Sequence, residues 1–311
     1  MLTARGSRRT QSGNSYGDLR KGLTLIRIHH LNCGTCCPVG GRLFDGYSRG
    51  VSAHLVCHCL LIETDAGLVL IDTGYGMQDV TRPRDRLSNF FRALNRPQLR
   101  PDETAVAQVR RLGFEPTDVR HIVVTHLDFD HAGGIEDFPN ARIHVTAREK
   151  EVADQRRGGV FVSRKRYRPQ QWDEAANWSL YPLGGGERWF GFDAVRDLDG
   201  LPPEILLVPL AGHTWGHAGI AIREDDGRWL FYAGDAYFHH AEITGEHRTC
   251  PPGLRGYQRL MQVDANARMT NQRRVRALSR EHGDQVRIFC AHDLTEFTAL
   301  SKHSNPQGAY P

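Results

Sequence analysis

The chain has 311 residues, of which 40% are hydrophobic and 24% charged, with a formal net charge of +4. This length and apolar content are sufficient to bury one large core or two small ones. The net charge is too small to indicate a nucleic-acid partner, and no run of about 18 apolar residues predicts a membrane-spanning helix. We therefore expect a globular protein that binds neither nucleic acid nor membrane.

Residues 1–21 are rich in Arg, Gly, Ser and Asn, which predicts a flexible tail before a single domain over 22–311. No apolar stretch follows the basic N-terminal residues, so we expect no secretory signal. The seven cysteines are an odd number, which favours a reducing compartment, the cytoplasm, over a disulfide framework. Cys33 and Cys36 have CxxC spacing, but no second pair at zinc-knuckle spacing follows, so we interpret them as buried or incidental thiols.

Short hydrophobic patterns predict nine strands, at 23–29, 53–63, 68–71, 122–124, 141–146, 205–209, 219–223, 229–233 and 288–290. Asp102 is expected to cap a helix that runs to Leu112, and a second helix is expected over 147–155. The segment 83–100 is basic and helix-prone. The strands occur in groups with helices between the groups, which indicates an α+β protein of packed sheets with helices outside.

The segment from about 156 to 200 is the least regular part of the chain. It contains six basic residues between positions 156 and 168, three tryptophans (Trp172, Trp178 and Trp189) and a run of three glycines. Two interpretations stay open: a lid or insertion over a site, and a solvated excursion on the surface.

Four potential metal ligands lie within six positions directly after the strand at 122–124. They are His126, Asp128, Asp130 and His131, and the chain continues with Ala132, Gly133 and Gly134. An extended loop can point neighbouring ligands to different sides, so that two metal ions close together can share such a cluster. A chance cluster of polar residues is a poor alternative at this density.

Three further clusters of ligand-type residues follow predicted strands. They contain His213 with His217, then Asp235, and finally His292. Each cluster alone is weak, because a single His is more often a structural residue. Together with the first cluster they indicate a metal site built at the ends of several strands.

The order of these motifs resembles the metallo-β-lactamase superfamily, especially its N-acyl-homoserine lactonase branch, from about residue 23 to 297. The resemblance implies an αββα sandwich of two packed mixed β-sheets with helices on the outer faces. It also implies that Asp72 supports the metal loop without binding metal. Two divalent metal ions are expected, Zn²⁺ in the first place, with Mn²⁺ or Fe²⁺ as alternatives. By resemblance, the first ion is bound by His126, Asp128 and His213, the second by Asp130, His131 and His292, and Asp235 bridges both.

Two features depart from the family pattern. Asp128 stands where the usual His-x-His-x-Asp-His motif has its second His, which adds oxygen character and leaves a weak or empty first site open. Lactonase-like enzymes also place a tyrosine shortly after the bridging Asp. Tyr237 is the candidate here for contact with the substrate carbonyl, although a packed aromatic residue is the alternative. His217 is expected to support its loop and His58 to pack in its strand. His239 and His240 are expected to face solvent, with a place in the lining of the pocket as the alternative.

The resemblance predicts a hydrolase in which a metal-bridging hydroxide opens a lactone or cleaves an ester, such as an acyl-homoserine lactone. Asp130 or a bound water is expected to protonate the leaving group. A phosphodiesterase or a thioesterase of the same fold is the enzymatic alternative, followed by an iron-dependent oxidoreductase. A metal-binding regulatory protein is the non-enzymatic alternative. The expected partner is a small-molecule substrate, and a homodimer is possible.

Overall fold

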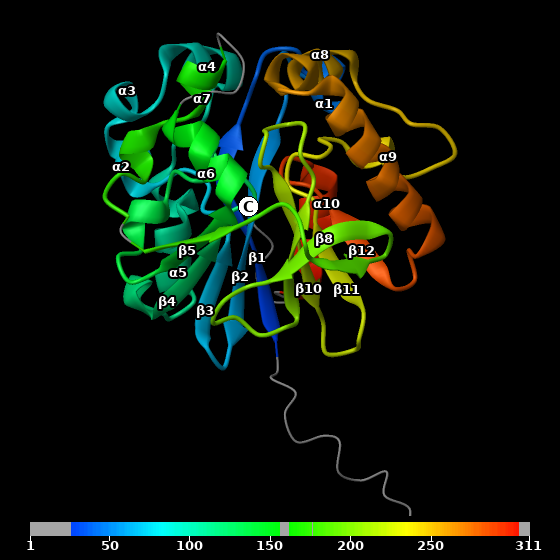
Figure 1. Cartoon of the computed structure of the whole chain (residues 1–311). Helices are drawn as coiled ribbons and strands as arrows, with labels where there is room; N and C mark the ends of the chain where they lie inside the picture. Colours follow the sequence, from blue (N-terminus) through cyan, green and yellow to red (C-terminus); the bar gives the residue numbers. More distant parts are fainter. Residues whose placement is uncertain (1–25, 156–161, 176, 305–311) are drawn as a thin grey trace, which may run out of the picture.

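A computed structural model describes residues 26–155, 162–175 and 177–304; the tail predicted at 1–21 lies outside these ranges. Two six-stranded sheets pack face to face, and helices cover the outer face of each (Figure 1). Both sheets are mixed, because each contains parallel and antiparallel pairs of strands. The expected αββα sandwich is therefore confirmed.

The first sheet has the order β1-β2-β3-β4-β5-β6. Its strands are β1 (Arg27–Cys36), β2 (Leu55–Thr64), β3 (Gly67–Ile71), β4 (Val119–Val123), β5 (Arg142–Thr146) and β6 (Trp178–Tyr181). The second sheet has the order β12-β11-β10-β9-β8-β7. Its strands are β7 (Glu187–Trp189), β8 (Phe192–Asp197), β9 (Ile205–Pro209), β10 (Ala218–Arg223), β11 (Trp229–Tyr232) and β12 (Val286–Phe289).

The helices fall into two groups by position in the chain. The first group is α1 (Arg42–Asp45), α2 (Met77–Thr81), α3 (Pro83–Arg86), α4 (Asn89–Asn95), α5 (Ala105–Arg111), α6 (Ala147–Asp154) and α7 (Ser163–Arg166). The second group is α8 (Pro252–Met261), α9 (Ala265–Glu281) and α10 (Leu294–Ser304). Short 3-10 turns lie at η1 (Pro101–Glu103), η2 (Pro116–Asp118), η3 (Ile135–Asp137), η4 (Pro169–Gln171) and η5 (His240–Glu242). Figure 1 shows α2 to α7 beside the first sheet and α9 beside the second.

Alternating side chains explain why both faces of each sheet are buried. Leu60 and Ile62 of β2 point into the core between the sheets, whereas Leu61 points to the opposite face with residues of α5 and α6. In β11, Tyr232 faces the core between the sheets and Phe231 faces α9. A strand covered on both faces has a nearly continuous apolar sequence, as these strands do.

The expected cap of the helix near residue 102 is wrong. Helix α5 begins after Thr104, whose hydroxyl accepts a hydrogen bond from the Ala107 amide at 3.3 Å. Asp102 lies in the 3-10 turn η1 instead. Thr104 has the usual geometry of an N-cap residue, because its side chain accepts a hydrogen bond from the amide of the third residue after it.

The described parts of the segment 156–200 join both sheets rather than forming one separate body. Strand β6 extends the first sheet at its edge, while β7 and β8 extend the second. Trp172 packs in the core beneath the first sheet and Trp189 in the core beneath the second. These two tryptophans are buried in the cores and contribute to folding.

Five functional segments leave the sheets at the same edge. Asp72 follows β3, His126 follows β4, His213 follows β9, Asp235 follows β11 and His292 follows β12. Since the strands are fixed by two buried cores, these loops start from rigid positions. In the described parts of the chain, no helix combines the length and the apolar character needed to cross a bilayer.

A buried polar chain crosses three strands of the first sheet. His144 of β5 lies 2.8 Å from His121 of β4 and 2.8 Å from the Tyr181 hydroxyl of β6. Burial, followed by the neighbouring His121 and Arg142, lowers the pKa of His144 to about 3. The folded protein therefore keeps His144 neutral at pH values where the unfolded chain protonates it.

We predict that this histidine makes the fold sensitive to acid. Between about pH 6.5 and pH 3 only the unfolded state binds the extra proton, so stability is present above this window and is lost as the pH falls through it. His144→Gln should reduce the slope of the free energy of unfolding against pH by up to about 1.4 kcal/mol per pH unit. Denaturant unfolding between pH 7 and pH 5 measures this slope. The exposed His247→Gln is the control, and an unchanged slope in His144→Gln would contradict the prediction.

Candidate metal centre

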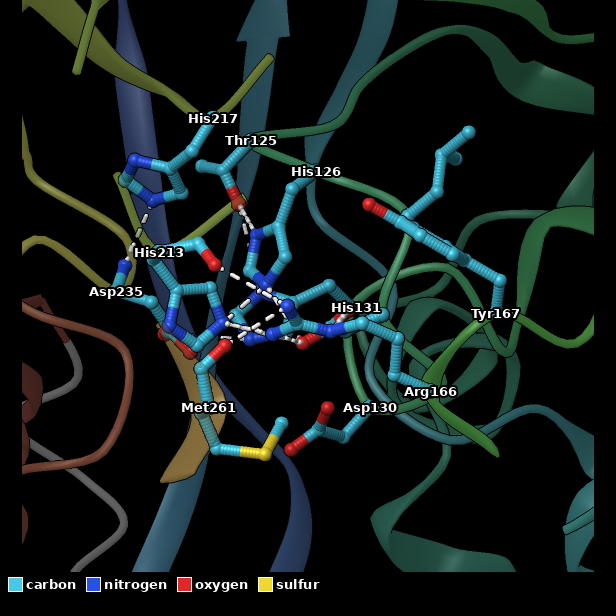
Figure 2. A network of polar contacts seen from close by, with 12 residues as sticks. Thr125, His126, Asp130, His131, Arg166, Tyr167, His213, His217, Asp235 and Met261 are labelled. Carbon is cyan, nitrogen blue, oxygen red and sulfur yellow. Dashed lines mark hydrogen bonds and ion pairs between the residues drawn. The ribbon is translucent and has the colours of Figure 1, made fainter. Parts of the chain in front are cut away.

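The seven residues predicted as metal ligands lie together at this edge of the sandwich, on four loops. Figure 2 labels His126, Asp130, His131, His213 and Asp235 among them. We divide them into two subsites that share Asp235. Subsite 1 consists of His126, Asp128, His213 and Asp235, and subsite 2 consists of Asp130, His131, His292 and Asp235. All seven side chains are buried.

Asp72 orients the loop after β4. Its carboxylate accepts hydrogen bonds from the Thr125 amide at 2.7 Å, the Thr125 hydroxyl at 2.8 Å and the Tyr232 hydroxyl at 2.9 Å. His131 Nδ1 lies 2.7 Å from the same carboxylate. This contact leaves Nε2 of His131 directed at the centre of the site, as in metal sites where a carboxylate supports a ligating histidine. The supporting role expected for Asp72 agrees with these contacts.

Subsite 2 has the geometry of a metal-binding site. His292 Nδ1 donates to the Val56 carbonyl at 2.7 Å, so its Nε2 is left for a ligand. The Asp235 Oδ1 atom lies 3.2 Å from His292 Nε2 and 3.4 Å from His131 Nε2, and Asp130 Oδ2 lies 3.9 Å from His292 Nε2. A tetrahedral ion with bonds of 2.0–2.1 Å separates its ligand atoms by about 3.4 Å.

Two of these atoms have no hydrogen-bond partner among the described residues: His131 Nε2 and Asp235 Oδ1. Buried polar atoms are rarely left unpaired, because each such atom loses its hydration without replacement. A divalent metal ion bound between them would satisfy both atoms at once. The donor set of two imidazoles and two carboxylates suits Zn²⁺, and also Mn²⁺ or Fe²⁺.

Subsite 1 has similar spacing but contains an additional cation. His213 Nε2 lies 3.1 Å from Asp128 Oδ2 and 3.2 Å from Asp235 Oδ2, and His126 Nε2 lies 3.4 Å from Asp128 Oδ2. The guanidinium of Arg166 reaches into this group from α7 (Figure 2). Burial alone would raise the pKa of Asp128, but Arg166 and His126 hold it well below its ordinary value. Asp128 is therefore a carboxylate.

Sequence reasoning noted Arg166 only as one of several arginines in an irregular segment. No local signal separates it from its basic neighbours at positions 156–168. The available signal was Asp128 itself, because a carboxylate in place of a neutral ligand needs a compensating charge when it is buried.

Other predicted residues have clear places. His217 donates from Nδ1 to the Leu210 carbonyl at 3.0 Å and accepts the Asp235 amide at 2.9 Å, so it supports its loop as expected. Tyr237 is fully buried beneath the second sheet, and its hydroxyl donates to Glu296 at 2.9 Å. Its hydroxyl thus points to α10, and Phe238 stacks on His292 instead. His239 and His240 are partly buried beside Asp293 rather than fully exposed.

The buried Glu149 of α6 connects two metal loops. Its carboxylate accepts the Leu127 amide at 3.0 Å and the Gly216 amide at 3.1 Å. The Thr146 hydroxyl also donates to the Gly216 carbonyl at 2.6 Å. A Cβ atom on Gly216 would lie 2.2 Å from the Glu149 amide nitrogen, so only glycine allows this contact.

We predict that Gly216→Ala separates this loop from α6 and displaces His213. The expected loss is about 1–3 kcal/mol in the free energy of unfolding, as for other overpacked sites. Gly256→Ala is the matched control, because no heavy atom lies within 4 Å of a Cβ there, and it should be neutral or stabilise α8 by about 0.5–1 kcal/mol. Denaturant unfolding measures both. Equal effects of the two substitutions would refute the role given to Gly216.

Comparison with known proteins agrees with the fold and the site. Residues 54–274 match the model of the metallo-beta-lactamase superfamily. A probable metallo-hydrolase of Mycobacterium tuberculosis (strain ATCC 25618 / H37Rv) is 42% identical over 274 residues, which is 86% of this chain and 80% of that protein. An N-acyl homoserine lactonase of Bacillus thuringiensis is 30% identical over 224 residues, 72% of this chain and 81% of that protein.

A solved structure of an N-acyl homoserine lactone hydrolase, with N-hexanoyl-L-homoserine bound at its catalytic metal centre, has a TM-score of 0.66 to this chain. It is 21% identical and the match covers 89% of this chain and 97% of that one, which supports the fold. The fold and the clustered His and Asp side chains define a metallo-hydrolase. The chain belongs to the metallo-β-lactamase superfamily.

Proposed function

We propose that the protein hydrolyses a lactone or a carboxylic ester of a small molecule with a metal ion in subsite 2. The observation that carries the proposal is the convergence of His131 Nε2, His292 Nε2 and the Asp235 carboxylate at 3.2–3.4 Å. A metal ion bound there lowers the pKa of water towards 7 and polarises a carbonyl group. Zn²⁺ is the proposed ion, and Mn²⁺ or Fe²⁺ are its alternatives.

The chain's own residues prepare this reaction. Asp72 and the Val56 carbonyl fix the two histidine rings, so that no reorientation is needed when substrate binds. Asp130 lies at the edge of subsite 2, and burial raises the pKa of its carboxyl group. We propose that the Asp130 carboxylate takes the proton that the attacking water releases and passes it to the leaving alkoxide.

A small pocket lies beside His292. Leu55, Leu254 and Phe238 supply apolar atoms to its wall, and Tyr47 and His239 lie at the same pocket. Its volume is too small for an acyl chain, so the support for an acyl substrate comes from the relatives. The relatives named N-acyl homoserine lactonase agree with such a substrate. A cytoplasmic location and a homodimer stay predictions.

The experiment that tests this proposal measures bound metal and hydrolysis in the same preparations. The substrates are acyl-homoserine lactones of several chain lengths, aryl esters, thioesters and a phosphodiester. We expect the lactones or esters to be hydrolysed, and Asp235→Asn to lose bound metal and roughly 100-fold or more in kcat/KM. Asp226→Asn, on an exposed turn, is the control.

Two outcomes would contradict the proposal. If the wild-type protein binds no metal after reconstitution with Zn²⁺, Mn²⁺ or Fe²⁺, the site lacks the chemistry proposed for it. If it binds metal and hydrolyses only the phosphodiester or the thioester, the protein is a metallo-hydrolase but the proposed substrate class is wrong.

A further inference from the structure

Arg166 contacts the atoms of subsite 1 that would bind a metal ion. Its Nη2 atom lies 2.7 Å from Asp128 Oδ2 and 2.9 Å from His213 Nε2 (Figure 2). We propose that the Arg166 guanidinium takes the place of the first metal ion, so that the chain binds one metal ion, in subsite 2. This inference rests on the proposed function. It predicts one metal ion, whereas the resemblance implied two.

The hydrogen-bond chemistry of His213 carries the argument. Arginine has donors and no acceptor, so the contact between Arg166 Nη2 and His213 Nε2 is a hydrogen bond in the tautomer that carries its proton on Nδ1, and the 3.1 Å contact of Nε2 with Asp128 Oδ2 is then not a hydrogen bond. A neutral imidazole has one lone pair on its unprotonated nitrogen. That lone pair is used by Arg166, and a metal ion in subsite 1 would need the same lone pair.

Further contacts fix Arg166 in this position. Nη1 donates to the His213 carbonyl at 3.1 Å and to the Met261 carbonyl at 2.9 Å, and Nε forms an ion pair with Asp128 Oδ1 at 2.7 Å. The next residue, Tyr167, forms a backbone β-bridge with Asp128. The side chain of Arg166 is completely buried. Its removal from subsite 1 would therefore break several contacts at once.

The charges of the two subsites also favour a metal ion in subsite 2 over one in subsite 1. Arg166 neutralises Asp128, so a dication placed in subsite 1 would lie beside a fixed positive charge in a buried setting. Subsite 2 has no arginine among its described contacts, and its carboxylates Asp130 and Asp235 are paired with histidines alone. A dication is stabilised there.

The test measures metal stoichiometry in the full chain. Metal is removed with a chelator, and the apoprotein is titrated with Zn²⁺ by calorimetry and with Co²⁺ by visible absorption, with elemental analysis after dialysis. We expect one equivalent of either ion in the wild-type protein. Two tightly bound equivalents would overturn the inference and leave the proposed function intact, whereas none would overturn the proposed function as well.

Two variants test the part played by Arg166. Arg166→Met frees His213 Nε2, and the double variant Asp128→His/Arg166→Met also restores the histidine of the family motif. Both should bind two equivalents, and paired Co²⁺ ions should show magnetic coupling in the electron paramagnetic resonance spectrum. Arg168→Met, which loses a contact to the Arg86 carbonyl away from the site, is the control and should bind one. If folded Arg166→Met still binds one, the inference is wrong; if it does not fold, the wild-type stoichiometry decides.

Discussion

Buried negative charge is the constraint on which this structure depends. Four aspartates, Asp72, Asp128, Asp130 and Asp235, lie within one small region at the edge of the sandwich, each less than a tenth exposed. Carboxylates that close together repel one another and lose hydration, so each one needs donors or cations nearby. The protein meets this need in different ways. Asp72 is surrounded by hydrogen-bond donors, Asp128 is paired with an arginine, and the other two face histidines.

Rigid surroundings make this arrangement possible. The metal loops follow strands that are covered on both faces, and Glu149 ties two of the loops to the same helix. Asp72 adopts a φ of 55°, a left-handed conformation that costs energy for most residues and that asparagine and aspartate tolerate best. The cost is offset by the hydrogen bonds that its carboxylate makes with the loop after β4. Polar residues are thus held in place by the apolar strands beneath them.

Much of the fold could be predicted from the sequence, because its main signals are local. The strands β2 and β9 to β11 have continuous apolar runs, and the strand-end clusters are dense in His and Asp. Residues whose role depends on contacts with distant parts of the chain were harder to predict from the sequence. Tyr237 follows Asp235 closely enough to be a candidate for substrate contact, but its side chain faces Glu296 on the helix that follows the last strand. Arg166 lies 38 positions from Asp128, and only the folded chain shows that the two are paired.

A metal ion bound in subsite 2 would have a mechanical consequence. His131 leaves the first sheet, whereas Asp235 and His292 leave the second. An ion bound between them would cross-link the two halves, and its binding energy would be added to the free energy that keeps the halves together. The thermal stability of the protein should therefore depend on the concentration of free metal ions. The metal balance of the cell would then set the lifetime of the folded protein as well as its catalytic rate.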